Sequence, residues 1–143
     1  MKKMLYIWDI EKAIKEIVEE HDLQINYEFN NELSSPMSFN ISTTTLKFNY
    51  LEVNGYLSKI RIKESKENLL KVIIYHELGY YVDYKKTKYD LRTFIYGDEE
   101  EIEQLKAQIE TNAWEYGRTL VPEELVGAYD KVRELDKMLI KGL

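Results

Sequence analysis

The chain has 143 residues, which is enough for one domain with a hydrophobic core and too few for two such domains. Its hydrophobic fraction of 44% and charged fraction of 32% are typical of a soluble globular protein and exclude a disordered one. The net charge of −6 argues against binding to a nucleic-acid backbone, and the absence of cysteine excludes disulfides, thiolate metal sites and cysteine nucleophiles.

The beginning of the chain has no pattern of a targeting segment. Asp9 and Glu11 follow the first apolar residues too closely to leave room for the apolar region of a signal peptide. The sequence also lacks an apolar run of about 18 residues, the length that a membrane-spanning helix needs. We therefore expect a cytoplasmic protein without a membrane segment.

Residues 6–20 place apolar side chains at helical spacing and predict an amphipathic helix that ends near His21. From Gln24 to Tyr56 the pattern changes to alternating residues rich in β-branched and aromatic side chains. This pattern predicts three short strands, in INYEF, MSFNI and TLKFNYLEV, that form a small antiparallel sheet. Asn54-Gly55 has the composition of a turn, and Ile60 with Ile62 suggests one more short strand.

Ser65 is expected to cap a helix formed by NLLKVIIYHELGYYVDYKK, which is apolar nearly all round between residues 69 and 82 and is therefore buried. Asp98 and Glu101 have the spacing of a capping box at the start of the next helix. Its apolar stripe consists of Ile102, Leu105, Ile109, Ala113, Tyr116 and Leu120.

Pro122 is expected at the first position of a final helix. The predicted fold is thus a single α+β domain over residues 1–143. It has an N-terminal helix, a small antiparallel sheet, a buried central helix and two C-terminal helices.

The central helix contains a near match to a zinc-binding motif, HELGY at residues 76–80. In the motif HExxH, two histidines four residues apart lie on one face of a helix and bind one zinc ion, while the glutamate activates water. Here His76 and Glu77 fit the motif, but Tyr80 occupies the place of the second histidine.

A second motif, ETNAWEYGRTLVP, begins at Glu110 on the flank of the next helix's apolar stripe. Ala113 and Gly117 are small enough to let another helix approach closely. A carboxylate at position 110 would then face the core, where a third metal ligand is needed.

Together the two motifs resemble those of the ImmA/IrrE family of HExxH zinc metallopeptidases, over roughly residues 36–125. The family pairs an HELGH-type helix with a later ExxAxxFAxxLLxP-like helix. The resemblance implies a minimal zincin-like domain in which His76 and Glu110 bind zinc and Glu77 is the general base. The chain departs from the family at Tyr80, at Tyr116 and Gly117, and in a shorter segment before Pro122.

Three outcomes are open for the incomplete ligand set. The Tyr80 phenolate could bind the metal, although the metal would have to lower its pKa from about 10. Asp83, two helical turns after His76, could supply the missing ligand in a site weaker for zinc. Alternatively no metal binds, and Tyr80 fills the space and hydrogen-bonds Glu110 or Glu77.

The resemblance also implies a protein substrate or partner, such as a repressor in the control of a mobile element or of stress. We therefore expect a degenerate metallopeptidase-like protein that binds or acts on a regulatory protein, and the sequence leaves open whether it has kept zinc and activity. The alternative is an active zinc-dependent endopeptidase. In the family, an edge strand holds the extended substrate, and Phe39, Asn40 and Ile41 are its candidates here. The alternative is that these strands are ordinary sheet structure without a role in binding. The sequence leaves the oligomeric state open.

Overall fold

The computed structural model describes residues 4–141 of the chain, and side chains as far as residue 136. The helices of this part are α1 (Ile7–Glu20), α2 (Tyr50–Lys59), α3 (Lys66–Lys86), α4 (Thr93–Tyr96), α5 (Glu99–Arg118) and α6 (Glu123–Lys141). The strands are β1 (Asn26–Phe29), β2 (Met37–Asn40) and β3 (Thr45–Phe48). The predicted α+β class and the predicted order of the main elements are confirmed.

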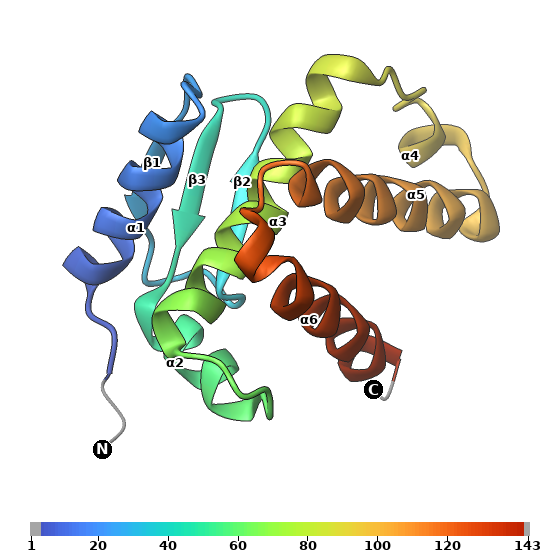
Figure 1. Cartoon of the computed structure of the whole chain (residues 1–143). Helices are drawn as coiled ribbons and strands as arrows, with labels where there is room; N and C mark the ends of the chain where they lie inside the picture. The colour runs from blue at the N-terminus through green and yellow to red at the C-terminus, as the bar shows by residue number, and fades with distance from the viewer. Residues whose placement is uncertain (1–3, 142–143) are drawn as a thin grey trace.

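Helix α3 runs through the centre of the molecule, with α1 and the sheet on one side and α5 and α6 on the other (Figure 1). Its sequence explains this position, because apolar residues lie on nearly all of its faces and eleven of its residues are buried. Among the residues that the structure describes, no helix has both the length and the apolar character that crossing a membrane requires.

The expected helix starts are confirmed by their capping contacts. The Ser65 hydroxyl accepts a hydrogen bond from the Asn68 N–H at 3.1 Å. Asp98 and Glu101 form the expected capping box, with bonds of 2.8 and 3.1 Å. The last helix starts at Glu123, one residue later than predicted, and the Pro122 carbonyl accepts its first hydrogen bond from Leu125.

The sheet is mixed, so the prediction of a purely antiparallel sheet was wrong. Its strand order is β1-β3-β2, in which β1 pairs with β3 in parallel and β2 pairs with β3 antiparallel. The chain leaves β1, passes to the far edge to form β2, and returns between the two as β3. Alternation of side chains reports that a strand exists, but it carries no information on the direction of the neighbouring strand.

The third strand ends earlier than predicted, and α2 replaces both its end and the predicted turn at Asn54-Gly55. The side chain of Asn49 caps this helix by accepting from the Leu51 N–H at 3.2 Å. Asn54 is not in a turn: its side chain bonds both the N–H and the carbonyl of Leu5, at 2.9 and 2.7 Å. The short strand suggested at Ile60 and Ile62 does not form either, since Ile60 is the C-cap of α2.

Helices α3 and α5 touch backbone to backbone, because glycines lie where they cross. A Cβ added to Gly79 would lie 1.8 Å from the Ala113 carbonyl oxygen. A Cβ on Gly117 would lie 2.5 Å from the Tyr75 carbonyl oxygen. The expectation that Ala113 and Gly117 permit a close helix approach is confirmed, and Gly79 of HELGY is the residue they accommodate.

The first prediction concerns this crossing. We expect Gly79→Ala to destabilise the fold by at least about 3 kcal/mol, because the new methyl group overlaps a backbone oxygen that cannot move without displacing α5. Urea unfolding followed by circular dichroism measures this change. Gly127→Ala in α6 is the matched control, since nothing lies within 4 Å of its new Cβ. That variant should gain up to about 1 kcal/mol from helix propensity. Equal stability of Gly79→Ala and the wild type would contradict the close crossing.

Candidate functional site

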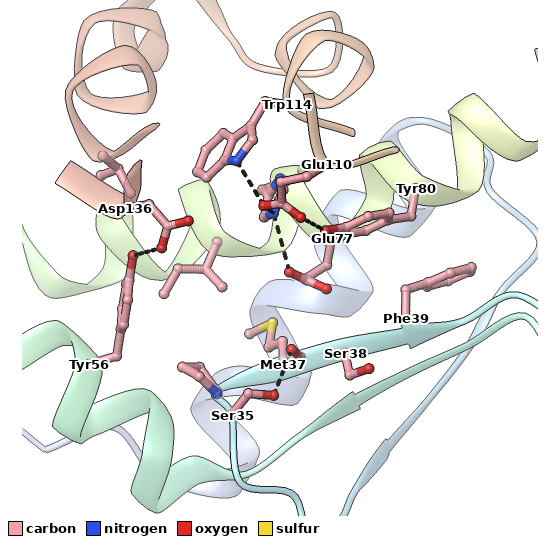
Figure 2. Close-up of a pocket in the computed structure, with 14 residues that line it drawn as sticks. Ser35, Met37, Ser38, Phe39, Tyr56, Glu77, Tyr80, Glu110, Trp114 and Asp136 are labelled. Atoms are coloured by element: carbon pink, nitrogen blue, oxygen red, sulfur yellow. Dashed lines mark hydrogen bonds and ion pairs between the residues drawn. The ribbon is translucent and has the colours of Figure 1, made fainter. Parts of the chain in front are cut away.

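The side chains of both motifs meet at a cavity of about 330 Å³ between α3, α5, α6, α2 and the start of β2 (Figure 2). Its walls combine carboxylates and aromatic rings, and none of the described residues that line it is a lysine or an arginine. The lining residues are Ser35, Pro36, Met37, Ser38, Phe39, Tyr56, Ile73, His76, Glu77, Tyr80, Glu110, Trp114, Val132 and Asp136.

The structure brings His76 and Glu110 together as the motifs predicted. His76 Nε2 lies 3.1 Å from Glu110 Oε1, and the His76 side chain is only 9% exposed. The imidazole stacks on the indole of Trp114, with the ring centroids 3.8 Å apart. The Trp114 Nε1–H also donates to Glu110 Oε1 at 3.1 Å. Trp114 therefore fixes the positions of both groups.

Tyr80 takes a direct part in this cluster, since its hydroxyl donates a hydrogen bond to Glu110 Oε2. Burial, followed by the charges of Glu77 and Glu110, raises the pKa of Tyr80 far above its ordinary value. Burial also acts to raise the pKa of Glu110, but hydrogen bonds from His76, Tyr80 and Trp114 outweigh it, so this pKa is lowered. The phenol thus keeps its proton and Glu110 keeps its charge.

Glu77 points into the cavity beside this cluster, and its side chain is 13% exposed. Its closest ionic neighbour is His76 Nε2, 3.7 Å away. Burial raises the pKa of Glu77 to about 7; His76 opposes this shift, and the charges of Glu110 and Asp136 add to it. Glu77 therefore has the position and the pKa of a group that exchanges a proton near neutral pH.

Asp83 is placed elsewhere. It is not among the residues that line the cavity, and its buried carboxylate accepts a hydrogen bond from the Tyr89 hydroxyl. Tyr89 in turn accepts from the side-chain amide of Asn112. Asp83 lies seven residues after His76, about 10 Å further along the helix axis. The two residues share a face of α3, but Asp83 is too far along the helix to reach the cavity.

The candidate substrate strand is β2, an edge strand that pairs only with β3 among the described strands. Phe39 lines the cavity and packs on Tyr81, with ring centroids 5.6 Å apart. Asn40 is the last residue of β2, and Ile41 follows it in the turn toward β3; neither lines the cavity. The part of the strand that reaches the site is therefore Met37 to Phe39.

Two further polar residues were missed by the sequence reasoning. The Tyr56 hydroxyl of α2 donates to Asp136 Oδ1 of α6 at 3.0 Å and closes one end of the cavity. Burial raises the pKa of Asp136. Eighty residues separate this pair in the chain, and neither residue belongs to a motif. Only the position of Asp136 one turn after the buried Val132 indicated that it faces inward.

The donor set does not fit a zinc ion. A catalytic zinc site needs three protein ligands and an open position, and His76 and Glu110 supply two. The third position holds the Tyr80 hydroxyl, which uses its proton for a bond to Glu110. Among the side chains that the structure describes, no group of three or more His, Cys, Asp or Glu residues is arranged to hold a metal ion.

No protein-family model matches the chain, and no curated protein matches it. Among solved structures, the crystal structure of the metallopeptidase zymogen of Methanocaldococcus jannaschii jannalysin aligns with a TM-score of 0.37 and 23% identity. The alignment covers 70% of this chain and 92% of that chain. A TM-score this low does not establish a common fold, so the family of the chain stays a prediction from its two motifs.

The second prediction uses the raised pKa of Glu77, about 7 against an ordinary 4.5. The folded state holds this proton more tightly than the unfolded state, so stability falls as the pH rises through that window. Glu77→Gln stays neutral and should therefore be the more stable protein at about pH 8, by up to roughly 3 kcal/mol, with the difference vanishing below about pH 4.5.

Urea unfolding at both pH values, with a chelator present, measures the difference. Glu16→Gln, on the exposed face of α1, is the control and should match the wild type at both. A wild type that gains stability over Glu77→Gln as the pH rises would show that the carboxylate has a stabilising partner.

Proposed function

We propose that the chain is a metallopeptidase-like protein that has lost its zinc site and binds an extended segment of a protein partner in the former active-site cleft. The HELGY and ETNAWEYGRTLVP motifs support the ancestry, because their key residues converge on one cavity. A regulatory protein such as a repressor is the class of partner that the family resemblance implies.

The observation that carries the loss of zinc is the hydrogen bond from Tyr80 to Glu110. In HExxH sites, a second imidazole and the metal stand where this phenol and its proton stand here. The Tyr80 hydroxyl gives the Glu110 carboxylate a hydrogen-bond donor in place of a cation. His76 Nε2, 3.1 Å from Glu110 Oε1, is a second donor. The carboxylate is thus satisfied by the protein's own groups.

The edge strand supports peptide binding in the cleft. The Asn49 N–H donates to the Pro36 carbonyl at 3.0 Å, which makes residue 36 part of a hydrogen-bonded pair with β3. Such pairs alternate along an antiparallel ladder, so Ser38 and Asn40 face β3. The backbone N–H and carbonyl of Phe39 then point to the free edge, where an added strand would bond them.

The alternative is an active zinc endopeptidase. It is supported by the contact between His76 and Glu110 and by the raised pKa of Glu77. Its difficulty is the ligand count. A third ligand from Tyr80 requires the phenol to ionise between two carboxylates, and Asp83 is bonded to Tyr89. The metal-free proposal requires no change in the protonation or the hydrogen bonds of these side chains.

The third prediction tests the loss of zinc. Purified protein should contain less than about a tenth of an equivalent of zinc, because a site short of one ligand loses several kcal/mol of binding free energy. Tyr80→His should gain stoichiometric zinc, since it restores the second imidazole on the same face of α3. Metal content by mass spectrometry and zinc titration by calorimetry measure both values.

Tyr80→Phe is the matched control, because it removes the hydroxyl without adding a ligand and should bind no more zinc than the wild type. One equivalent of zinc in the wild type, together with a protease activity that Glu77→Gln abolishes, would overturn the metal-free proposal. A Tyr80→His protein that folds but binds no zinc would contradict the proposal that Tyr80 is what keeps zinc out of the site.

The fourth prediction tests the strand edge. In the free protein, the amide of Phe39 should exchange with solvent faster than those of Ser38 and Asn40, because only the latter are bonded to β3. Hydrogen exchange followed by NMR resolves the three amides, and a bound partner segment should slow Phe39 selectively. Equal protection of all three in the free protein would contradict a free edge.

A further inference from the structure

A second surface, separate from the cleft, exposes large apolar side chains around α4. Leu91, Phe94, Ile95 and Tyr96 are 56%, 39%, 74% and 82% exposed, and no residue of α4 is buried. None of these residues lines the cavity of the candidate site. Exposed apolar residues gathered in one short segment are typical of an interaction surface.

The helix beside this segment is also only partly covered. Figure 1 shows α4 beside the N-terminal half of α5, on the opposite side of the molecule from α1 and the sheet. The predicted stripe of α5 is only half-buried at Ile102, Leu105 and Ile109, and the first fully buried residue of the helix is Ala113. An amphipathic helix normally buries such a stripe.

The surface also contains a hollow next to the protruding side chains. Its volume is about 320 Å³, and it is lined by Asp90, Arg92, Thr93, Tyr96, Gly97 and Glu101. An isoleucine side chain is smaller than this hollow, and Ile95 is the neighbouring apolar residue that projects into solvent. The same surface thus offers both an apolar projection and a recess.

Charges of opposite sign flank the α4 segment. Exposed basic residues precede it at Lys85, Lys86 and Lys88, and exposed acidic residues follow it at Asp98, Glu99, Glu100, Glu101 and Glu103. Asp90 and Arg92, which lie between these groups, form an ion pair with each other. A surface with one sign on each side is complementary to itself under a twofold rotation. The acidic run also disfavours an anionic membrane as the occupant.

We propose that the α4 surface, residues 91–96 with the N-terminal half of α5, joins two copies of this chain about a twofold axis. Ile95 of each copy enters the hollow of the other, and the basic flank of each faces the acidic flank of the other. Isologous contacts of this kind use the same patch on both subunits. The proposal does not depend on the proposed function of the cleft.

The fifth prediction is the oligomeric state in solution. Sedimentation equilibrium of the wild type should give twice the mass of one chain. Ile95→Glu should reduce this to the mass of one chain, because a desolvated charge would face the hollow. Leu51→Glu is the matched control, since it places the same charge on a leucine that is 57% exposed in α2 and should leave the dimer intact.

A cross-link then tests whether both copies use the same surface. The chain has no cysteine, so Ile95→Cys introduces the only thiol. Because both copies use the same patch about one axis, a short thiol-reactive cross-linker should join the two thiols of Ile95→Cys, whereas it should not join those of Leu51→Cys. A wild type that is monomeric at all concentrations tested, or a dimer that survives Ile95→Glu, would overturn the proposal.

Discussion

The close crossing of α3 and α5 is the constraint on which the rest of the structure depends. Because Gly79 has no side chain, the backbone of α5 reaches that of α3 at Ala113, and a Cβ at position 79 would overlap a carbonyl oxygen at 1.8 Å. This contact puts Glu110, one turn before Ala113, within 3.1 Å of His76. A wider helix spacing would leave the buried His76 side chain, which is only 9% exposed, without this partner, at a cost comparable to a lost hydrogen bond.

Within this frame, one side chain determines the chemistry of the cleft. Glu110 receives hydrogen bonds from His76, Tyr80 and Trp114, all supplied by the chain itself. A metal ion would compete with the first two of these donors. In the function proposed above, Tyr80 replaces a place for a divalent cation with a hydrogen-bonded network of the protein's own groups, while the cavity and the neighbouring edge strand remain. Loss of the metal and retention of a binding cleft are therefore compatible in one structure.

Features that rest on neighbouring residues could be predicted from the sequence. The Ser65 and Asp98 caps and the burial of α3 follow from short spacings and helical periodicity. The meeting of His76 with Glu110, on two different helices, was expected from the resemblance of the two motifs to those of a known family. Features that rest on distant pairing could not. The parallel pairing of β1 with β3 and the hydrogen bond from Tyr56 to Asp136 join segments that are not adjacent in the sequence, and no local pattern specifies such contacts.

Helix α2 is an intermediate case. Its residues have the apolar and aromatic composition of a strand, and Asn54-Gly55 has the composition of a turn. The tertiary bonds of Asn54 to the backbone of Leu5, 49 residues away, favour the helix instead. Local propensity is a weak guide where a side-chain amide satisfies backbone groups of another segment.

The stacking of Trp114 on His76 gives the protein an intrinsic fluorescent reporter. The chain has two tryptophans, and they lie in opposite environments: Trp8 is 66% exposed and Trp114 is 4% exposed. Their emission maxima should therefore separate, with the blue-shifted component belonging to the cleft. Any group that enters between His76 and Glu110 must disturb the hydrogen bond of the Trp114 indole, so occupancy of the cleft can be followed optically without a label.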